Sequence, residues 1–272
     1  EAVTGKDLDL VVKENIRGEE GTYVDITVLR GENAEETPLH VERRSIEVPT
    51  VEYQMLENQV GYIYVTQFDE VTAKQFEDAI DDLEDQGMEK LVIDLRNNPG
   101  GVLDTAVEML AYVLPEDKLD GMLVYTADKN GEGDRYFCKD GKIQRESDDG
   151  SRDSRYPKED DHELDVPLAV LVNGNSASAS EVFTGAVMDY DAGIVVGTTT
   201  FGKGIVQNLI PLGDGTAIKL TTAHYYTPNG FDLHGKGLEP DVVVEMDEEL
   251  QKKAVVELSE DNQLQAAIEA MN

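Results

Sequence analysis

The fold is decided by an apolar run that ends in a polar, glycine-rich turn: Leu91-Val92-Ile93-Asp94-Leu95-Arg96-Asn97-Asn98-Pro99-Gly100-Gly101. Its first five residues are typical of a strand buried on both faces. The Pro-Gly-Gly that follows allows positive φ angles and close approach of the backbone to its neighbours. We therefore expect a buried strand, a tight turn and then a helix.

Strand and helix alternate on both sides of this stretch, which indicates a layered α/β fold with a parallel sheet. The apolar patterns predict strands at 60–68, 91–95, 122–126, 168–173 and 193–197, and helices at 72–86, 102–114 and 181–190. A hairpin at 205–211 and 217–226 and a short strand at 240–245 complete this part.

Three regions break the alternation. Residues 1–50, with a helix at 6–17 and strands at 23–30 and 38–43, form a small unit that cannot bury a core alone. In residues 129–165, the stretches 129–134 and 140–141 suggest a hairpin around a strand at 135–139. Because the region is rich in charge, Ser and Gly, we expect a solvated surface insertion without a catalytic role. The sequence of the tail, residues 248–272, predicts one or two helices.

Composition excludes several function classes. The chain has 23 Lys and Arg against 57 Asp and Glu, a net charge of −34, which disfavours nucleic acid and anionic membranes as partners. No apolar run is long enough to span a membrane, and the chain opens without the pattern of a signal peptide. The single cysteine, Cys138, forms no intrachain disulfide, and a buried thiol is a better reading than a nucleophile.

The first candidate for chemistry is Gly174-Asn175-Ser176-Ala177-Ser178-Ala179-Ser180-Glu181. It lies between a buried strand and a helix, so a serine hydroxyl would sit beside free N–H groups and the positive end of the helix dipole. Read alone, Ser178 with Glu181 three residues later is more simply a capping box, and Ser176 or Ser180 could also cap the helix.

The second candidate is Gly197-Thr198-Thr199-Thr200-Phe201-Gly202-Lys203-Gly204. It falls short of a phosphate-binding P-loop, because Gly204 replaces the Ser or Thr and a strand follows instead of a helix. Lys203 is then either a solvated surface charge or a desolvated lysine, and a neutral lysine can accept a proton from serine.

The third candidate is the turn 94–101 itself. Its glycine N–H groups could line an oxyanion hole. The simpler alternative is a tight turn with Asp94 and Arg96 as structural polar groups.

Together these segments resemble the C-terminal processing peptidases, also called tail-specific proteases, which are serine peptidases of family S41. The resemblance covers almost the whole chain and rests on 94–101, 176–181, 201–207 and the closing 235–241, in the same order along the chain. It implies an α/β core of the crotonase and Clp-peptidase type (residues 51–272), preceded by a partial PDZ domain (residues 1–50) whose front half is missing.

The resemblance also implies roles for individual residues. Ser178 would be the nucleophile, Lys203 its general base and Gln207 the residue that orients the lysine. The backbone amides of Gly101 and Ala179 would form the oxyanion hole, with Gly100 as the neighbouring alternative to Gly101. No metal or cofactor is needed.

The implied function is endoproteolysis near the C-termini of protein or peptide substrates, outside the cytoplasm. A homo-oligomer and a regulatory partner bound through the PDZ unit are compatible with the resemblance.

Three alternatives remain open at this stage. A pair of Ser178 with His224 has no supporting motif; the other histidines are His40, His162 and His234. A catalytically silent scaffold would keep the fold without the activity. A crotonase-like acyl-CoA enzyme would share the oxyanion hole but not the serine and lysine.

Overall fold

The computed structural model describes residues 3, 5–31, 34–45, 47–114, 121–139, 142–155, 164–213, 215–253 and 256–272. The chain divides into two compact units, Glu1–Val48 and Pro49–Asn272. The division falls close to the expected boundary between residues 50 and 51.

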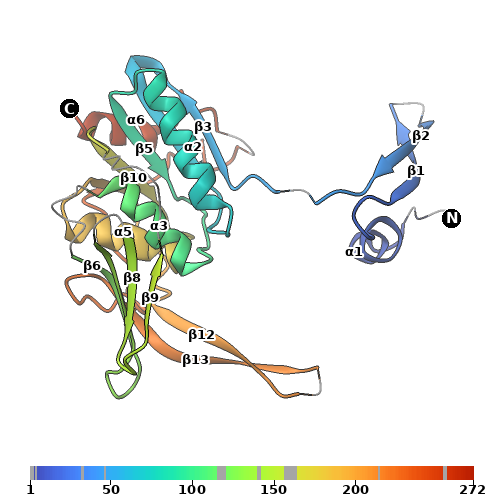
Figure 1. The fold of residues 1–272 in the computed structure, drawn as a ribbon. Coiled ribbons are helices and arrows are strands. Elements are labelled where there is room, and N and C mark those ends of the chain that lie inside the picture. Colours follow the sequence, from blue (N-terminus) through green and yellow to red (C-terminus); the bar gives the residue numbers. More distant parts are fainter. Residues whose placement is uncertain are drawn as a thin grey trace. The chain divides into compact units, whose positions relative to one another are not determined.

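The first unit is a short helix followed by a two-stranded hairpin (Figure 1). The helix is α1 (Leu8–Val11), continued by the π-helical turn η1 (Val12–Ile16). Strands β1 (Tyr23–Arg30) and β2 (Glu35–Glu42) pair antiparallel over their full length. Within the described residues of this unit Val11 is the only buried hydrophobic side chain, so it has no core of its own. Its assignment as part of a PDZ domain stays a prediction.

The second unit is built on a six-stranded sheet. Its order is β14-β11-β10-β5-β4-β3, and all neighbours are parallel except β3 and β4. The strands are β3 (Val51–Met55), β4 (Val60–Val65), β5 (Lys90–Asp94), β10 (Leu168–Val172), β11 (Ile194–Gly197) and β14 (Val242–Val243). The predicted parallel α/β sheet is therefore confirmed. The edge strand β3 and the 3-10 turn η2 (Glu57–Gln59) were not predicted, because β3 lacks an apolar run.

A second six-stranded sheet is antiparallel throughout, in the order β12-β13-β6-β7-β8-β9. Its strands are β6 (Met122–Ala127), β7 (Asp134–Lys139), β8 (Lys142–Ser147), β9 (Arg152–Arg155), β12 (Ile205–Pro211) and β13 (Ala217–Tyr226).

The second sheet corrects the expectation of a solvated insertion at 129–165. Residues 134–155 supply three of its strands, and Tyr136 and Ile143 are buried in the main core. These isolated apolar residues lie among charges, so the sequence pattern did not reveal them. Residues 156–163, with His162, and the side chain of Cys138 lie outside the described residues.

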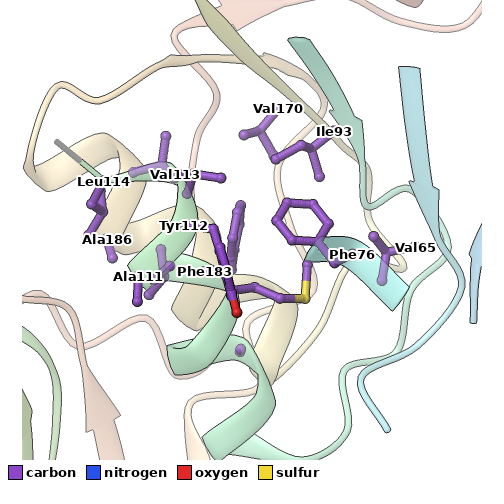
Figure 2. Packing of buried hydrophobic residues seen from close by; sticks show 14 of the residues in the cluster. Val65, Phe76, Ile93, Ala111, Tyr112, Val113, Leu114, Val170, Phe183 and Ala186 are labelled. Atoms are coloured by element: carbon purple, nitrogen blue, oxygen red, sulfur yellow. The ribbon is translucent and has the colours of Figure 1, made fainter. Parts of the chain in front are cut away.

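Helices cover both faces of the parallel sheet. Helices α2 (Thr72–Asp85), α3 (Leu103–Val113) and α5 (Ala179–Asp189) pack on one face, and α6 (Asn262–Ala270) on the other. Figure 2 shows Phe76, Tyr112 and Phe183 from the first three helices beside Ile93 and Val170 of the sheet. Successive residues of β10 point to opposite faces: Val170 joins this cluster, whereas Leu171 packs with Leu264 of α6.

The tail contains one helix, in agreement with the expectation of one or two. Only 262–270 is a helix within the described part of 248–272, and residues 248–252 form turns. Helix α6 belongs to the fold, since Leu264, Ala267 and Met271 are buried against the sheet. Among the helices described, none has the length and apolar character needed to cross a membrane.

Candidate active site

Three loops meet at the carboxyl edge of the parallel sheet. They follow β5, β10 and β11, which are neighbours in the order β11-β10-β5. This edge is where open α/β sheets place their sites. The three candidate segments of the sequence, 94–101, 174–181 and 197–204, are therefore brought together as expected.

Two of the three serines in 176–180 have structural roles. Ser176 Oγ donates to Leu95 O at 2.8 Å and accepts from Asn173 N–H at 2.9 Å. Ser180 Oγ donates to Asn98 O at 3.0 Å. Both side chains are fully buried, and their hydrogen bonds connect the serine loop, residues 174–181, to the loop after β5.

Ser178 differs from both neighbours. It is half-buried and begins α5 with φ 57° and ψ −114°, a backbone conformation that non-glycine residues rarely adopt. The expected capping box is present, and in it Glu181 Oε2 accepts from Ser178 N–H at 2.9 Å. The strained turn holds the residue at the tip of the loop, as in a nucleophile elbow.

The glycine turn, Pro99-Gly100-Gly101, lies directly against Ser178. A Cβ atom placed on Gly100 would be 2.8 Å from Ser178 Cβ and 2.8 Å from Ala179 N. On Gly101 it would be 1.9 Å from Phe68 O, so both positions need glycine. Pro-Gly-Gly thus lets one loop press against the other, as the sequence predicted.

The N–H groups around Ser178 distinguish Gly101 from Gly100. Gly100 N–H donates to Asn98 Oδ1 at 2.9 Å and is not available to a ligand. Within the described structure, the N–H groups of Gly101 and Ala179 donate no hydrogen bond. These are the two amides assigned to the oxyanion hole.

The lysine loop, residues 197–204, is hydrogen-bonded to the segment 235–241. Thr200 N–H donates to Leu238 O at 3.0 Å, and Gly235 N–H donates to Gly202 O at 2.9 Å. Lys203 is half-buried, and β12 begins two residues after it. A strand after the lysine confirms that this loop is not a P-loop.

The side chains of the expected dyad are near in the fold but not bonded. In the residues described, no hydrogen bond joins Ser178 Oγ to Lys203 Nζ, or Lys203 to Gln207. Gln207 is exposed on β12, and its Nε2 donates to Thr221 Oγ1 at 3.4 Å. Catalytic hydrogen bonds are often long in unliganded enzymes and shorten when substrate binds.

His224 lies in a separate polar group on β13. Its Nδ1 is 3.5 Å from Asp232 Oδ2, and its ring meets His234 edge-on with 4.9 Å between centroids. Among the described side chains, no group of three or more His, Cys, Asp and Glu is arranged to hold a metal ion.

The structural role considered for Asp94 and Arg96 is observed, but sequence reasoning missed that they belong to a buried ion network with Asp261. The Arg96 guanidinium bonds Asp94 Oδ2 at 2.6 Å and Asp261 Oδ2 at 2.7 Å. Tyr62 Oη donates to Asp94 Oδ2 at 2.7 Å, and burial followed by the Asp94 charge raises the pKa of Tyr62. Asp261 is remote in sequence, so only the fold reveals it.

Comparison with known proteins agrees with this geometry. The model of peptidase family S41 matches residues 59–244. Relatives named "Probable CtpA-like serine protease" from Staphylococcus aureus and Staphylococcus haemolyticus are each 39% identical, over 90% and 89% of this chain. The chain spans only 44% of the length of these relatives.

Solved structures show the same similarity. A photosystem II D1 C-terminal processing protease aligns with a TM-score of 0.57 and 28% identity, over 84% of this chain and 57% of the other. A lipoprotein from Streptococcus agalactiae shares the fold, with a TM-score of 0.52 and 20% identity over 72% of this chain and 65% of its own. The glycine turn, the serine loop and the lysine loop all lie inside the matched region, and the chain belongs to peptidase family S41.

Proposed function

We propose that the protein is a serine endopeptidase in which Ser178 is the nucleophile and Lys203 the general base. One observation carries the proposal: Ser178 occupies a strained turn directly against Gly100, and the N–H groups of Gly101 and Ala179 donate no described hydrogen bond. A serine hydroxyl with free N–H donors in the adjoining turn suits acyl transfer.

The chemistry follows from these groups. Neutral Lys203 Nζ takes the proton of Ser178 Oγ as the oxygen attacks the scissile carbonyl carbon. The Gly101 and Ala179 amides stabilise the oxyanion that forms. When the C–N bond breaks, Lys203 returns the proton to the leaving amine, and an ester remains on Ser178. Water then attacks the ester, Lys203 accepts its proton, and Ser178 Oγ regains one as the acid leaves.

Gln207 has a positioning role in this scheme. It stands on β12 four residues beyond Lys203, and its amide now meets Thr221. To orient the amine of Lys203, the Gln207 side chain would have to leave Thr221 when substrate is bound.

The substrate class and the setting belong to the same proposal. The relatives include a C-terminal processing protease, which supports cleavage near the C-termini of protein substrates. We place the activity outside the cytoplasm and assign residues 1–48 to a PDZ-type unit that binds substrate or a regulatory partner. The charge of −34 argues against nucleic acid as a ligand.

The test is cleavage of fluorescein-labelled casein by the 272-residue chain, with Ser178→Ala and Ser176→Ala compared. Ser178→Ala should abolish cleavage and labelling by a fluorophosphonate probe, with the circular dichroism spectrum unchanged. Ser176→Ala should lower stability but keep the labelled serine. Absence of both cleavage and labelling in the wild type would favour a silent scaffold.

A further inference from the structure

Glu181 is a buried carboxylate that touches both loops of the proposed dyad. It lies in the first turn of α5 with 0% of its surface exposed. Its Oε1 accepts from Thr200 Oγ1 at 2.6 Å and from Gly202 N–H at 2.7 Å. Its Oε2 accepts from Ser178 N–H at 2.9 Å and from Lys203 N–H at 2.8 Å.

The Oε2 atom therefore joins the backbones of the two residues that must exchange a proton. No other side-chain atom with a described hydrogen bond contacts both of them. Four donors on two oxygens match an ionised carboxylate, which only accepts hydrogen bonds. Two of the four donors, Thr200 Oγ1 and Gly202 N–H, would otherwise be buried without an acceptor, and buried unpaired donors are unfavourable.

Helix capping does not account for this arrangement. In a capping box the carboxylate of the third helical residue accepts one hydrogen bond, from the N–H of the N-cap residue, here Ser178. The other three bonds of Glu181 go to residues 200–203, which lie in a different loop. Thr200 is fixed in turn, because its Oγ1 also accepts from Leu238 N–H at 2.8 Å.

We propose that Glu181 is a positioning residue that sets the distance between Ser178 and Lys203. It holds the first turn of α5 and the lysine loop against one carboxylate and does not touch the substrate. This inference rests on the proposed function, because it concerns the geometry of the same dyad. An error of about 1 Å in such a geometry reduces the rate roughly a hundredfold.

Three variants of the 272-residue chain test the proposal. Glu181→Gln keeps the shape but turns an NH2 group toward two of the four donors. Glu181→Asp keeps both accepting oxygens on a shorter side chain. Thr184→Val is the matched control, because it removes a buried bond within α5, Thr184 Oγ1 to Ser180 O at 2.8 Å, that involves neither Ser178 nor residues 200–203.

The measurements are kcat and KM for fluorescein-labelled casein, the rate of fluorophosphonate labelling, and the melting temperature. Glu181→Gln should lower kcat and the labelling rate together by about 100-fold, with KM changed less than about threefold. Glu181→Asp should fall between Glu181→Gln and wild type. Thr184→Val should lower the melting temperature and keep kcat within about twofold of wild type.

The proposal is overturned by a folded Glu181→Gln with kcat near the wild-type value, or by an equal loss of kcat in Thr184→Val. If Glu181→Gln does not fold, Glu181→Asp decides, and full wild-type kcat in that variant would contradict the role. Failure of the proposed function looks different, since Ser178→Ala would then cleave casein as wild type does.

Discussion

Gly100 and Ser178 approach each other so closely that a methyl group on the glycine would stand 2.8 Å from the serine Cβ. The contact joins the turn after β5 to the N-terminus of α5. It shows how two loops far apart in sequence come to lie directly against each other.

Gly100→Ala should therefore damage the site more than the fold. The new Cβ would also lie 2.4 Å from Ala177 O, so the serine loop must shift. We expect kcat for casein to fall about 100-fold. Gly131→Ala is the control: its φ of +84° resembles the +92° of Gly100, but nothing lies within 4 Å. It should cost only about 1 kcal/mol of stability through the positive φ. Equal kcat values in the two variants would refute the steric account.

Asp261 should stabilise the turn through Arg96. Asp261→Asn keeps an N-cap for α6 but removes the charge that faces the guanidinium, and we expect a loss of about 3 kcal/mol in the free energy of unfolding. Asp261→Ala should lose about 1 kcal/mol more, because the cap is lost too. Urea unfolding at pH 7 measures both.

The exposed pair of Lys74 and Asp78 provides the comparison. Asp78→Asn should change the free energy of unfolding by no more than about 0.5 kcal/mol, because surface pairs contribute little. If Asp261→Asn lowered the free energy of unfolding by no more than Asp78→Asn does, the buried ion network would not stabilise the turn.

Tyr62 makes the stability depend on alkaline pH. Burial and the Asp94 charge raise the pKa of Tyr62 in the folded state above the value of about 10 in the unfolded chain. The contribution of Tyr62 to the free energy of unfolding is therefore fully present below pH 10 and is lost progressively as the pH rises above 10. Between pH 10 and 11, wild type should lose about 1 kcal/mol more of its free energy of unfolding than Tyr62→Phe. Parallel pH dependences in urea unfolding would show that Tyr62 is not the group responsible.

Gln207 should matter for rate and not for stability. Gln207→Ala should lower kcat about tenfold, because poor orientation of Lys203 removes part of the rate gain from general-base catalysis. Its free energy of unfolding should stay within about 0.5 kcal/mol of the wild-type value. Asn208→Ala is the matched control on the same strand, since Asn208 Nδ2 donates to Thr222 Oγ1 at 3.0 Å. Unchanged kcat in Gln207→Ala would remove this residue from the site.

The parallel sheet and the edge that carries the site followed from local pattern. Apolar strands such as Leu168–Val172, each followed by small or glycine-rich residues, predicted the parallel sheet and the place of Ser178 and Lys203. The meaning of Ser178 did not follow from pattern alone, because a capping serine and a nucleophile have the same local sequence. The structure distinguishes Ser178 from its neighbours, because Ser178 has a positive φ of 57° whereas Ser176 and Ser180 donate buried hydrogen bonds.

Long-range polar contacts could not be predicted. Glu181 appeared as a cap, yet three of its bonds reach residues 200–203. Asp261 meets Arg96 only because α6 packs on the sheet. Tyr136 and Ile143 were hidden in a charged segment for the same reason: burial is decided by partners that a local window does not contain.

The most direct test compares Lys203→Met with His224→Asn for cleavage of fluorescein-labelled casein, after circular dichroism has shown both to be folded. The dyad account predicts that Lys203→Met loses at least about a thousandfold in kcat/KM, within the range that removal of a general base produces, whereas His224→Asn stays near wild type. Near-wild-type cleavage by Lys203→Met, or its loss in His224→Asn alone, would contradict the account.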